Sequence, residues 1–251
     1  MSKFVENANL PRKVEKLIVG KAYREFLDES LRSLEIEPIY CPSNPDIDER
    51  LSGHCDLSVL HERDNTVFLA PYLKNSVFSA ELERTGCNTL YPQVNMGEKY
   101  PEDSRFNLCL LKNTFFYSPK VSSINIVDHL ISNEMKPIAI KQGYCRCSTC
   151  IVNERSIITS DTTVYQRALV NDMDCLLISP GYISLEGFDY GFIGGSSFKI
   201  SDDQLCFTGN INKHPDKESI LAFLKKHHVY PVFLTDLPIF DIGSAVPLTE
   251  K

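Results

Sequence analysis

Residues 56–92, DLSVLHERDNTVFLAPYLKNSVFSAELERTGCNTLYP, contain one complete structural unit. The apolar runs LSVL and TVFLAP predict two strands, and HERDN between them carries the Asn and Asp that suit a hairpin turn. SVFSAELERTG then predicts a helix, which Gly86 ends in a left-handed conformation. NTLYP predicts a third strand. The stretch therefore predicts a unit in the order strand, strand, helix, strand.

The same unit recurs along the chain. Each further copy combines two apolar runs, a helical segment and a last apolar run, and the copies begin near residues 107, 147 and 195. In the copy that begins near 147, Asp161 or Thr162 is placed to cap the helix TTVYQRALVN. In the copy that begins near 195, Pro215 and Asp216 stand where a helix start favours them.

The two ends of the chain complete a fifth unit. DIGSAVPLTE at 241–250 supplies its first strand, and KLIVG, YREFLDESLRSL and IEPIY supply the second strand, the helix and the third strand. Such units would close into a ring, because each unit buries its apolar faces only against its neighbours. We therefore expect an α/β fold, a five-bladed α/β propeller with fivefold pseudosymmetry around a central channel. It would be one domain over residues 1–251, closed by an N-terminal segment (12–42) and a C-terminal segment (238–251).

Composition and charge restrict the class of partner. The chain is 43% hydrophobic with a formal net charge of -7, and it has no long run of Lys or Arg to follow a phosphate backbone. The N-terminus lacks the apolar core of a secretory signal, and no window reaches the roughly 18 apolar residues of a membrane span. We expect a cytoplasmic protein without a nucleic-acid or membrane partner. The oligomeric state is left open.

Three of the nine cysteines fall together in CRCSTC, at Cys145, Cys147 and Cys150. A zinc site usually has four ligands, and this cluster supplies three with no obvious fourth. In an extended strand Cys147 and Cys150 would also point to opposite faces. We therefore expect no metal and no cofactor. Cys147 is either a reactive thiol or a structural one, and Cys150, inside the apolar run CIV, is expected in the core.

Several long motifs resemble those of an uncharacterised bacterial family assigned to the pentein, or guanidino-modifying enzyme, fold. They are GHCDLSVLH, IKQGYCRCSTCIV, SIITSD, CLLISPGYISLEGFDYGFIGGSS, FTGNINKHPD and FDIGSAVPL, and the resemblance extends from about residue 12 onward. It implies an arginine-like or guanidine-like substrate in the central channel. Pentein hydrolases and transferases use a Cys nucleophile near the C-terminus, a His from the preceding unit, and carboxylates that hold the guanidinium.

This chain departs from that pattern at each catalytic position. DIGSAVPL offers Gly243 and Ser244 where the nucleophile would stand, and GFIGGSSF has no His. The carboxylate motif of the enzymes would fall on CRCSTC. None of the three roles is therefore carried over by position.

We expect the candidate site where the first strand of each unit begins, because those strand ends would meet at the channel. The candidate catalytic residues are Cys147, His54 and Asp56, and the candidate ligand-binding residues are Asn107, Cys145, Gly195, Ser196, Asp241 and Ser244. The aromatic segment 181–195 is expected to form an ordered loop near the mouth of the ring.

Two interpretations of His54 and Asp56 remain open. Two residues apart on a strand, they would point to the same side and could transfer protons together with Cys147. They could equally satisfy hydrogen bonds at a loop-to-strand junction. Asp241 could likewise hold a cationic ligand or cap a turn.

We therefore expect a protein that binds a small polar metabolite, guanidino-like or amino-acid-like, in its channel. It would be either a hydrolase of a C–N bond with a non-standard site, or a catalytically inactive homologue that acts as a binding or protein-interaction module. The pKa of the Cys147 thiol would help to separate the two classes.

Overall fold

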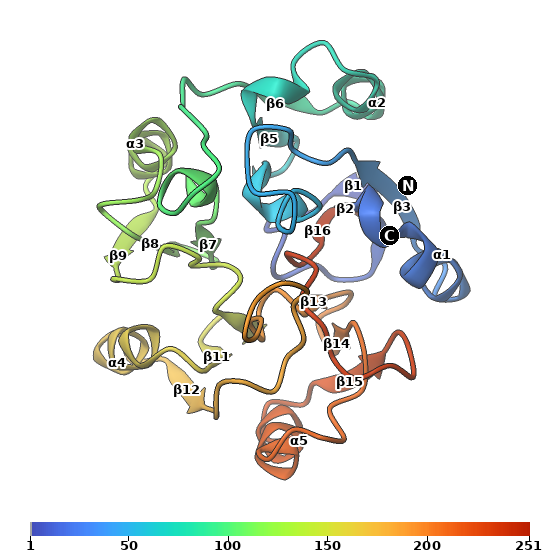
Figure 1. The fold of residues 1–251 in the computed structure, drawn as a ribbon, viewed down its shortest axis with the longest axis vertical. Coiled ribbons are helices and arrows are strands. Elements are labelled where there is room, and N and C mark those ends of the chain that lie inside the picture. The colour runs from blue at the N-terminus through green and yellow to red at the C-terminus, as the bar shows by residue number, and fades with distance from the viewer. Residues whose placement is uncertain (1) are drawn as a thin grey trace.

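The computed structural model describes residues 2–251. Five small sheets surround a common centre, and the five α-helices lie on the outer rim of the ring (Figure 1). This arrangement confirms the predicted five-bladed α/β propeller. Within the described residues, no helix is long and apolar enough to cross a membrane.

The strands are short, and one α-helix belongs to each blade. The strands are β1 (Lys3–Phe4), β2 (Val14–Gly20), β3 (Glu37–Cys41), β4 (Val59–Arg63), β5 (Thr66–Leu69), β6 (Asn88–Leu90), β7 (Cys109–Leu110), β8 (Thr114–Tyr117), β9 (Lys136–Ala139), β10 (Cys150–Asn153), β11 (Ser156–Thr159), β12 (Asp174–Leu177), β13 (Ser197–Lys199), β14 (Gln204–Phe207), β15 (Tyr230–Phe233) and β16 (Val246–Glu250). The helices are α1 (Arg24–Ser33), α2 (Val77–Thr85), α3 (Ile124–Ser132), α4 (Thr162–Val170) and α5 (Lys217–Lys226). Short 3-10 turns lie at Lys21–Tyr23, Cys55–Leu57, Pro71–Leu73 and Glu102–Ser104.

Each blade follows one topology. The first strand pairs antiparallel with the second, and the second pairs parallel with the third, which the helix connects; in four of the five blades a short turn joins the first two strands. In the blade of β4, β5 and β6, Ser76 caps α2 by accepting a hydrogen bond from the Ser79 N–H (3.0 Å), and Gly86 ends the helix at φ 98°. This is the left-handed end that the sequence predicts.

The other helix starts were predicted with mixed success. Asp161 caps α4, because its Oδ1 accepts hydrogen bonds from the N–H groups of Thr163 (2.7 Å) and Val164 (2.9 Å). Asp216 precedes α5, as expected, but its side chain does not cap that helix. Its Oδ2 accepts a hydrogen bond from the Ser179 N–H (2.6 Å), so it ties α5 to the chain that follows β12.

Both chain ends share the remaining blade. Its strand order is β1-β16-β2-β3, and β16 pairs antiparallel with β2, with Val246 opposite Ile18. Segments near the two ends therefore form one sheet, as the pattern predicts, and the N and C labels lie close together in Figure 1. The two-residue strand β1 was not predicted, because two residues are too few to show a period.

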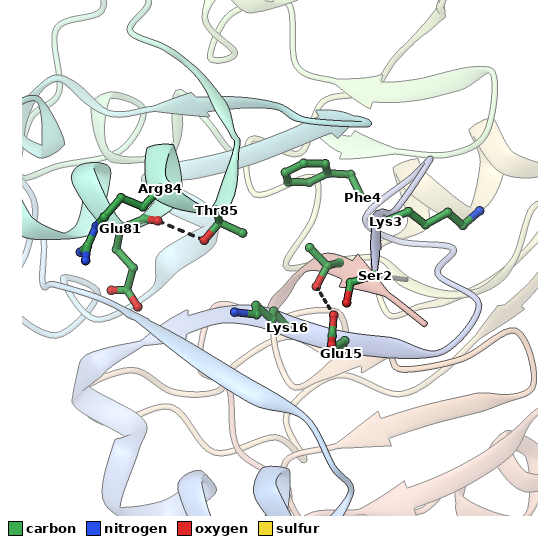
Figure 2. Close-up of a pocket in the computed structure, with 9 residues that line it drawn as sticks. Ser2, Lys3, Phe4, Glu15, Lys16, Glu81, Arg84 and Thr85 are labelled. Atoms are coloured by element: carbon green, nitrogen blue, oxygen red, sulfur yellow. Dashed lines mark hydrogen bonds between the residues drawn. The ribbon is translucent and has the colours of Figure 1, made fainter.

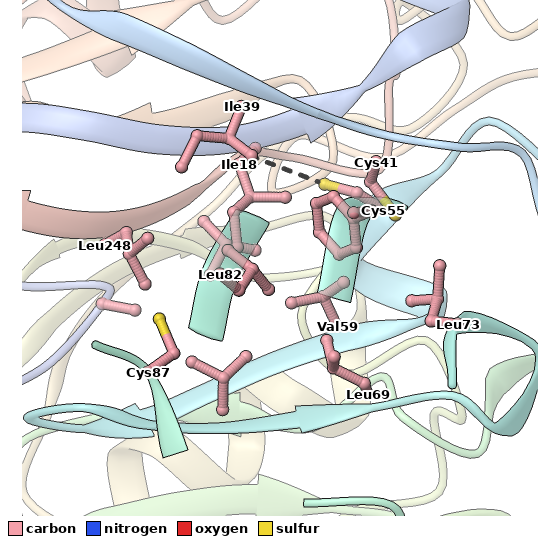
Figure 3. Close-up of a cluster of buried hydrophobic side chains, with 14 of the residues drawn as sticks. Ile18, Ile39, Cys41, Cys55, Val59, Leu69, Leu73, Leu82, Cys87 and Leu248 are labelled. Carbon is pink, nitrogen blue, oxygen red and sulfur yellow. Dashed lines mark hydrogen bonds between the residues drawn. The ribbon is translucent and has the colours of Figure 1, made fainter. Parts of the chain in front are cut away.

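Apolar clusters lie between neighbouring blades as well as within them. One cluster joins Ile18 and Leu248 of the closing blade to Val59, Leu69 and Leu82 of the next blade, as Figure 3 shows. All five side chains are buried. A blade removed from the ring would therefore expose a core face to water, which makes the ring the cooperative unit. The nine cysteines are free thiols, and only Cys175 is partly exposed.

Candidate functional site

Three of the predicted residues meet around one sulfur atom. The Cys147 thiol donates a hydrogen bond to Asp56 Oδ2 (3.0 Å), and Asn107 Nδ2 donates to Cys147 Sγ (3.3 Å). The ligand atoms of His54, Asp56 and Cys147 all lie within 4.8 Å of one another. The three side chains are buried. The structure thus brings together the residues predicted to be catalytic, from segments about 90 residues apart in the chain.

His54 and Asp56 do not lie on a strand, as the sequence analysis expected. His54 is an extended residue before the 3-10 turn Cys55–Leu57, and β4 begins only at Val59. The turn still directs both side chains toward Cys147. Gly243 makes room for them, because a Cβ at this position would lie 2.3 Å from the Cβ of His54 and its φ is +67°. A residue with a side chain would displace the pair.

Cys145 and Cys147 also lie outside a strand, and β10 begins at Cys150. The reason is a side chain from the preceding blade. Asn107 Oδ1 accepts hydrogen bonds from the N–H groups of Arg146 (2.8 Å) and Cys147 (3.1 Å), which holds this segment in a turn. The turn carries Cys147 to the site, whereas Cys150 packs in the core, as predicted.

Asp241 brings a second carboxylate to the site. Its Oδ1 lies 3.9 Å from His54 Nδ1, and the carboxylate accepts hydrogen bonds from the N–H groups of Phe192 (2.8 Å) and Gly243 (2.9 Å). Gly195 lies against it, because a Cβ at Gly195 would be 2.0 Å from Asp241 Oδ1. The N–H of Gly195 donates to the Cys147 carbonyl (2.8 Å). Gly195 therefore shapes the site through its backbone.

The other three predicted ligand-binding residues have internal hydrogen-bond partners. The Cys145 thiol donates to the Gln142 carbonyl (3.1 Å), and the Ser196 hydroxyl donates to the Ile193 carbonyl (3.0 Å). Ser244 Oγ accepts a hydrogen bond from Arg146 Nη2 (2.6 Å). These three side chains lie outside the cluster around Cys147 and outside the cavity described below.

Burial controls the protonation states of the site. It raises the pKa of the Asp56 carboxyl from 3.8 to about 7, with a further upward contribution from Asp241. Burial also raises the pKa of the Cys147 thiol well above its usual value, and the negative charges of Asp56 and Asp241 add to the effect. Burial lowers the pKa of His54, and Asp241 opposes that change. At neutral pH the cluster therefore holds a protonated thiol beside a neutral imidazole.

Two buried polar atoms of the cluster have no hydrogen-bond partner among the described residues. They are His54 Nε2 and Asp56 Oδ1. Unpaired buried polar atoms are costly, and they concentrate where a ligand or a reaction will use them. Among the described residues, Asp103, Thr149 and His214 also carry a buried polar atom without a hydrogen-bond partner.

The same donors are of the types that bind transition metals. Imidazole nitrogen, thiolate sulfur and carboxylate oxygen all coordinate zinc, and His54, Asp56 and Cys147 could together hold an ion. The thiol–carboxylate contact of 3.0 Å is a hydrogen bond in this structure. The metal site considered from the sequence, C-x-C-x2-C, does not form, because Cys145, Cys147 and Cys150 have separate surroundings.

A cavity of about 250 Å³ opens above the cluster. His54, Cys147 and Asp241 line it on one side, and the remaining lining residues are Leu51, Tyr144, Leu185, Phe188, Asp189, Tyr190 and Phe192. The aromatic segment 181–195 thus borders the site, as expected. Tyr144 and Leu51 were missed, although Tyr144 directly precedes the cysteine cluster. Its hydroxyl donates to Asp103 Oδ2 (2.6 Å), which fixes the ring in the wall.

A larger hollow, about 460 Å³, lies on the outside of the ring near β1, β2 and α2. Figure 2 shows side chains that line it, among them Lys3, Lys16, Glu81 and Arg84. It shares no lining residue with the cavity above Cys147. The larger hollow is wide and open, whereas the smaller cavity is lined by the buried titratable groups of His54, Cys147 and Asp241, so the smaller one is the better candidate for chemistry.

The fold is shared with solved structures of guanidino-modifying enzymes. SxtG, an amidinotransferase of the saxitoxin pathway from Microseira wollei, matches with a TM-score of 0.61 at 10% identity, over 98% of this chain and 97% of its own. The inosamine-phosphate amidinotransferase StrB1 from Streptomyces griseus matches with a TM-score of 0.58 at 11% identity, over 98% and 96%. A DDAH from Pseudomonas aeruginosa matches with a TM-score of 0.53 at 10% identity, over 88% and 93%.

These similarities show that the chain has the pentein fold, and at such low identity they show the fold alone. No curated protein matches the chain in sequence. A family model matches residues 18–246, which is nearly the whole chain. The chain therefore belongs to the family of unknown function DUF6873.

Proposed function

We propose that this protein hydrolyses a C–N bond in a small guanidine or amidine cation. One observation carries the proposal: the Cys147 thiol, the His54 imidazole and the Asp241 carboxylate line one cavity, and Asp56 accepts a hydrogen bond from that thiol. Cys147 would be the nucleophile and His54 the general base and acid. Asp241 would hold the cation, and Asp56 would orient the thiol through their hydrogen bond.

A bound cation would change the protonation balance in the direction that catalysis needs. In the free site, burial and two nearby carboxylates keep the Cys147 thiol protonated. A positive charge beside Asp241 favours the thiolate, because it offsets those negative charges. Neutral His54 can then accept the thiol proton, and Asp241, 3.9 Å from its Nδ1, would stabilise the imidazolium.

The reaction would proceed in two balanced steps. Cys147 Sγ adds to the central carbon of the cation while its proton passes to His54. His54 then returns that proton to the leaving nitrogen as the C–N bond breaks. In the second step His54 takes a proton from water, the resulting hydroxide adds to the sulfur-bound carbon, and the C–S bond breaks. The thiol recovers a proton from His54, so the enzyme is unchanged.

The test is the release of ammonia or amine from a panel of guanidines and amidines. Cys147→Ser should lower the rate by at least about 10³-fold, because no other thiol reaches the cavity. Cys145→Ser is the matched control: its thiol is equally buried but lies outside the cluster, so the rate should change little. A chelator should leave the rate unchanged, since the proposal uses no metal. Equal rates for the Cys147→Ser variant and the unmodified protein would exclude this mechanism.

A second candidate function is ligand binding without turnover. The observation that favours it is the protonated Cys147 thiol, which donates its hydrogen to Asp56 and lacks the lowered pKa of an activated cysteine. In that case a cation would bind with similar affinity to the unmodified protein and to the Cys147→Ser variant, and no product would form. Calorimetry combined with the release assay separates the two functions.

A further inference from the structure

Two kinds of side chain line the cavity above Cys147: titratable ones, and apolar or aromatic ones. Apolar and aromatic side chains make most of the wall, and Phe188 and Tyr190 remain 39% and 41% exposed. The Phe192 ring lies 6.4 Å from the Tyr190 ring and 6.0 Å from the Tyr144 ring, centroid to centroid. Large aromatic side chains that stay exposed around a concave site commonly contact a ligand. The wall therefore suits an apolar or aromatic group.

The charges that line this cavity are all negative. Asp241 is buried beside His54, and Asp189 is exposed on the loop that carries Phe188. Among the described residues that line the cavity, none is Lys or Arg. Proteins bind carboxylate groups with Arg, Lys or clustered N–H donors. A ligand with a carboxylate would meet repulsion here and find no cationic partner.

Arg50 is close to the wall but is already engaged. Its guanidinium stacks on the Phe188 ring at 4.4 Å from the centroid. It also donates hydrogen bonds to the Gly187 carbonyl (2.8 Å) and to Asp48 Oδ1 (2.9 Å). These contacts hold the loop that carries Phe188, and they leave the Arg50 guanidinium paired with the Asp48 carboxylate. Arg50 therefore supports the aromatic wall and does not supply a carboxylate site.

We propose that this cavity selects cations that carry an aromatic or bulky apolar group and no carboxylate, and that it discriminates against free amino acids such as arginine. The ligand class is thus substituted guanidines, amidines or related cations with an apolar tail. The cationic head lies toward Asp241, and the tail packs between Phe188, Tyr190 and Phe192. The proposal rests on the proposed function only for the position of the cationic head, and it holds whether or not the bound cation is hydrolysed.

The test compares three ligands by titration calorimetry on the full chain with Cys147→Ser, so that turnover does not interfere. Benzylguanidine has the cation and an aromatic tail, agmatine has the cation and an extended amine, and arginine adds a carboxylate. Benzylguanidine should bind at least about tenfold more tightly than arginine, with agmatine between them. Equal or tighter binding of arginine, or no binding of benzylguanidine, would overturn the proposal.

Two variants with matched controls locate the selectivity. Phe188→Ala should weaken benzylguanidine binding about tenfold and agmatine binding much less, whereas Tyr182→Ala, an exposed aromatic of the same loop outside the cavity, should change neither. Asp189→Lys should reduce the factor by which benzylguanidine binds more tightly than arginine. Glu186→Lys, on the same loop but outside the cavity, should leave that factor unchanged. An unchanged preference in both cavity variants would contradict the assignment.

The outcomes also separate this proposal from the proposed function. Tight benzylguanidine binding without product from the unmodified protein would support the selectivity and reject the hydrolase. Product from arginine at a rate equal to that from benzylguanidine would support the hydrolase and reject the selectivity.

Discussion

At the scale of single residues, Asp56 is a buried carboxyl whose ionisation costs stability. Its side chain is buried, its Oδ1 has no partner among the described residues, and burial raises its pKa from 3.8 to about 7. A carboxyl with a raised pKa stabilises the folded state fully below pH 3.8, and that contribution is lost as the pH rises toward 7. At neutral and higher pH, Asp56 therefore lowers the free energy of unfolding.

Replacing Asp56 should therefore stabilise the protein at high pH. Asp56→Asn resembles the protonated carboxyl but does not ionise, so its free energy of unfolding relative to that of the unmodified chain should be about 3 kcal/mol higher at pH about 8 than at pH about 5. Urea unfolding at both pH values measures this difference. Asp128→Asn, on the exposed face of α3, is the control and should show no such growth. A difference that stays constant with pH would show that Asp56 ionises freely in the folded protein.

The sequence predicted which of these residues lie together better than it predicted their local conformation, because His54, Asp56 and Cys147 lie in turns and not on strands. His54, Asp56, Asn107, Cys147, Gly195 and Asp241 were all named from their places at the starts of predicted strands, and the structure brings them together. Cys145, Ser196 and Ser244 stood at similar places, yet their polar groups bond to neighbouring residues. A shift of one residue in register decides which side chain reaches the site, and a sequence pattern does not fix the register to within one residue.

At the scale of elements, the strands and helices follow from their periods, while the turns that build the site do not. Apolar runs and capping residues predict α2 and α4 closely. The 3-10 turn Cys55–Leu57 and the turn before β10 depend on contacts from other blades, above all on Asn107. Tertiary contacts of this kind leave no local signal in the sequence.

We predict that Asn107 is required for the turn that carries Cys147. Asn107→Ala leaves the buried N–H groups of Arg146 and Cys147 without an acceptor, at a cost of about 1–3 kcal/mol for each group. Chemical unfolding should show this loss of free energy. Asn113→Ala, in an exposed hairpin turn, should cost much less. If the two variants have equal stability, Asn107 does not hold the turn.

At the scale of the whole molecule, closure of the ring depends on the last strand. β16 lies between β1 and β2, and its residue Leu248 is fully buried among side chains of the closing blade and of the next blade. The predicted segments 12–42 and 238–251 do meet in one sheet. The repeat made this closure predictable. The N-terminal region has the second strand, the helix and the third strand of a fifth unit but lacks its first strand, and the C-terminal region supplies that strand.

Removal of residues 246–251 should abolish cooperative unfolding, because it takes a central strand and leaves the faces of two blades exposed. Thermal unfolding followed by circular dichroism should show a broad transition for the truncated chain, where the unmodified chain shows one sharp transition. Removal of the exposed Lys251 alone should leave the transition within a few degrees of the original. A truncated chain that still unfolds sharply would mean that the other blades form a stable unit by themselves.

The pairing of β16 with β2 also has a consequence for biosynthesis. The ribosome makes β2 early and its neighbour β16 after every other strand of the ring, so one edge of β2 has no partner strand until residues 246–250 have been made. Asp241 reaches the site at the same late moment. Until that segment is made, a nascent chain can neither complete the sheet of the closing blade nor bring Asp241 beside His54.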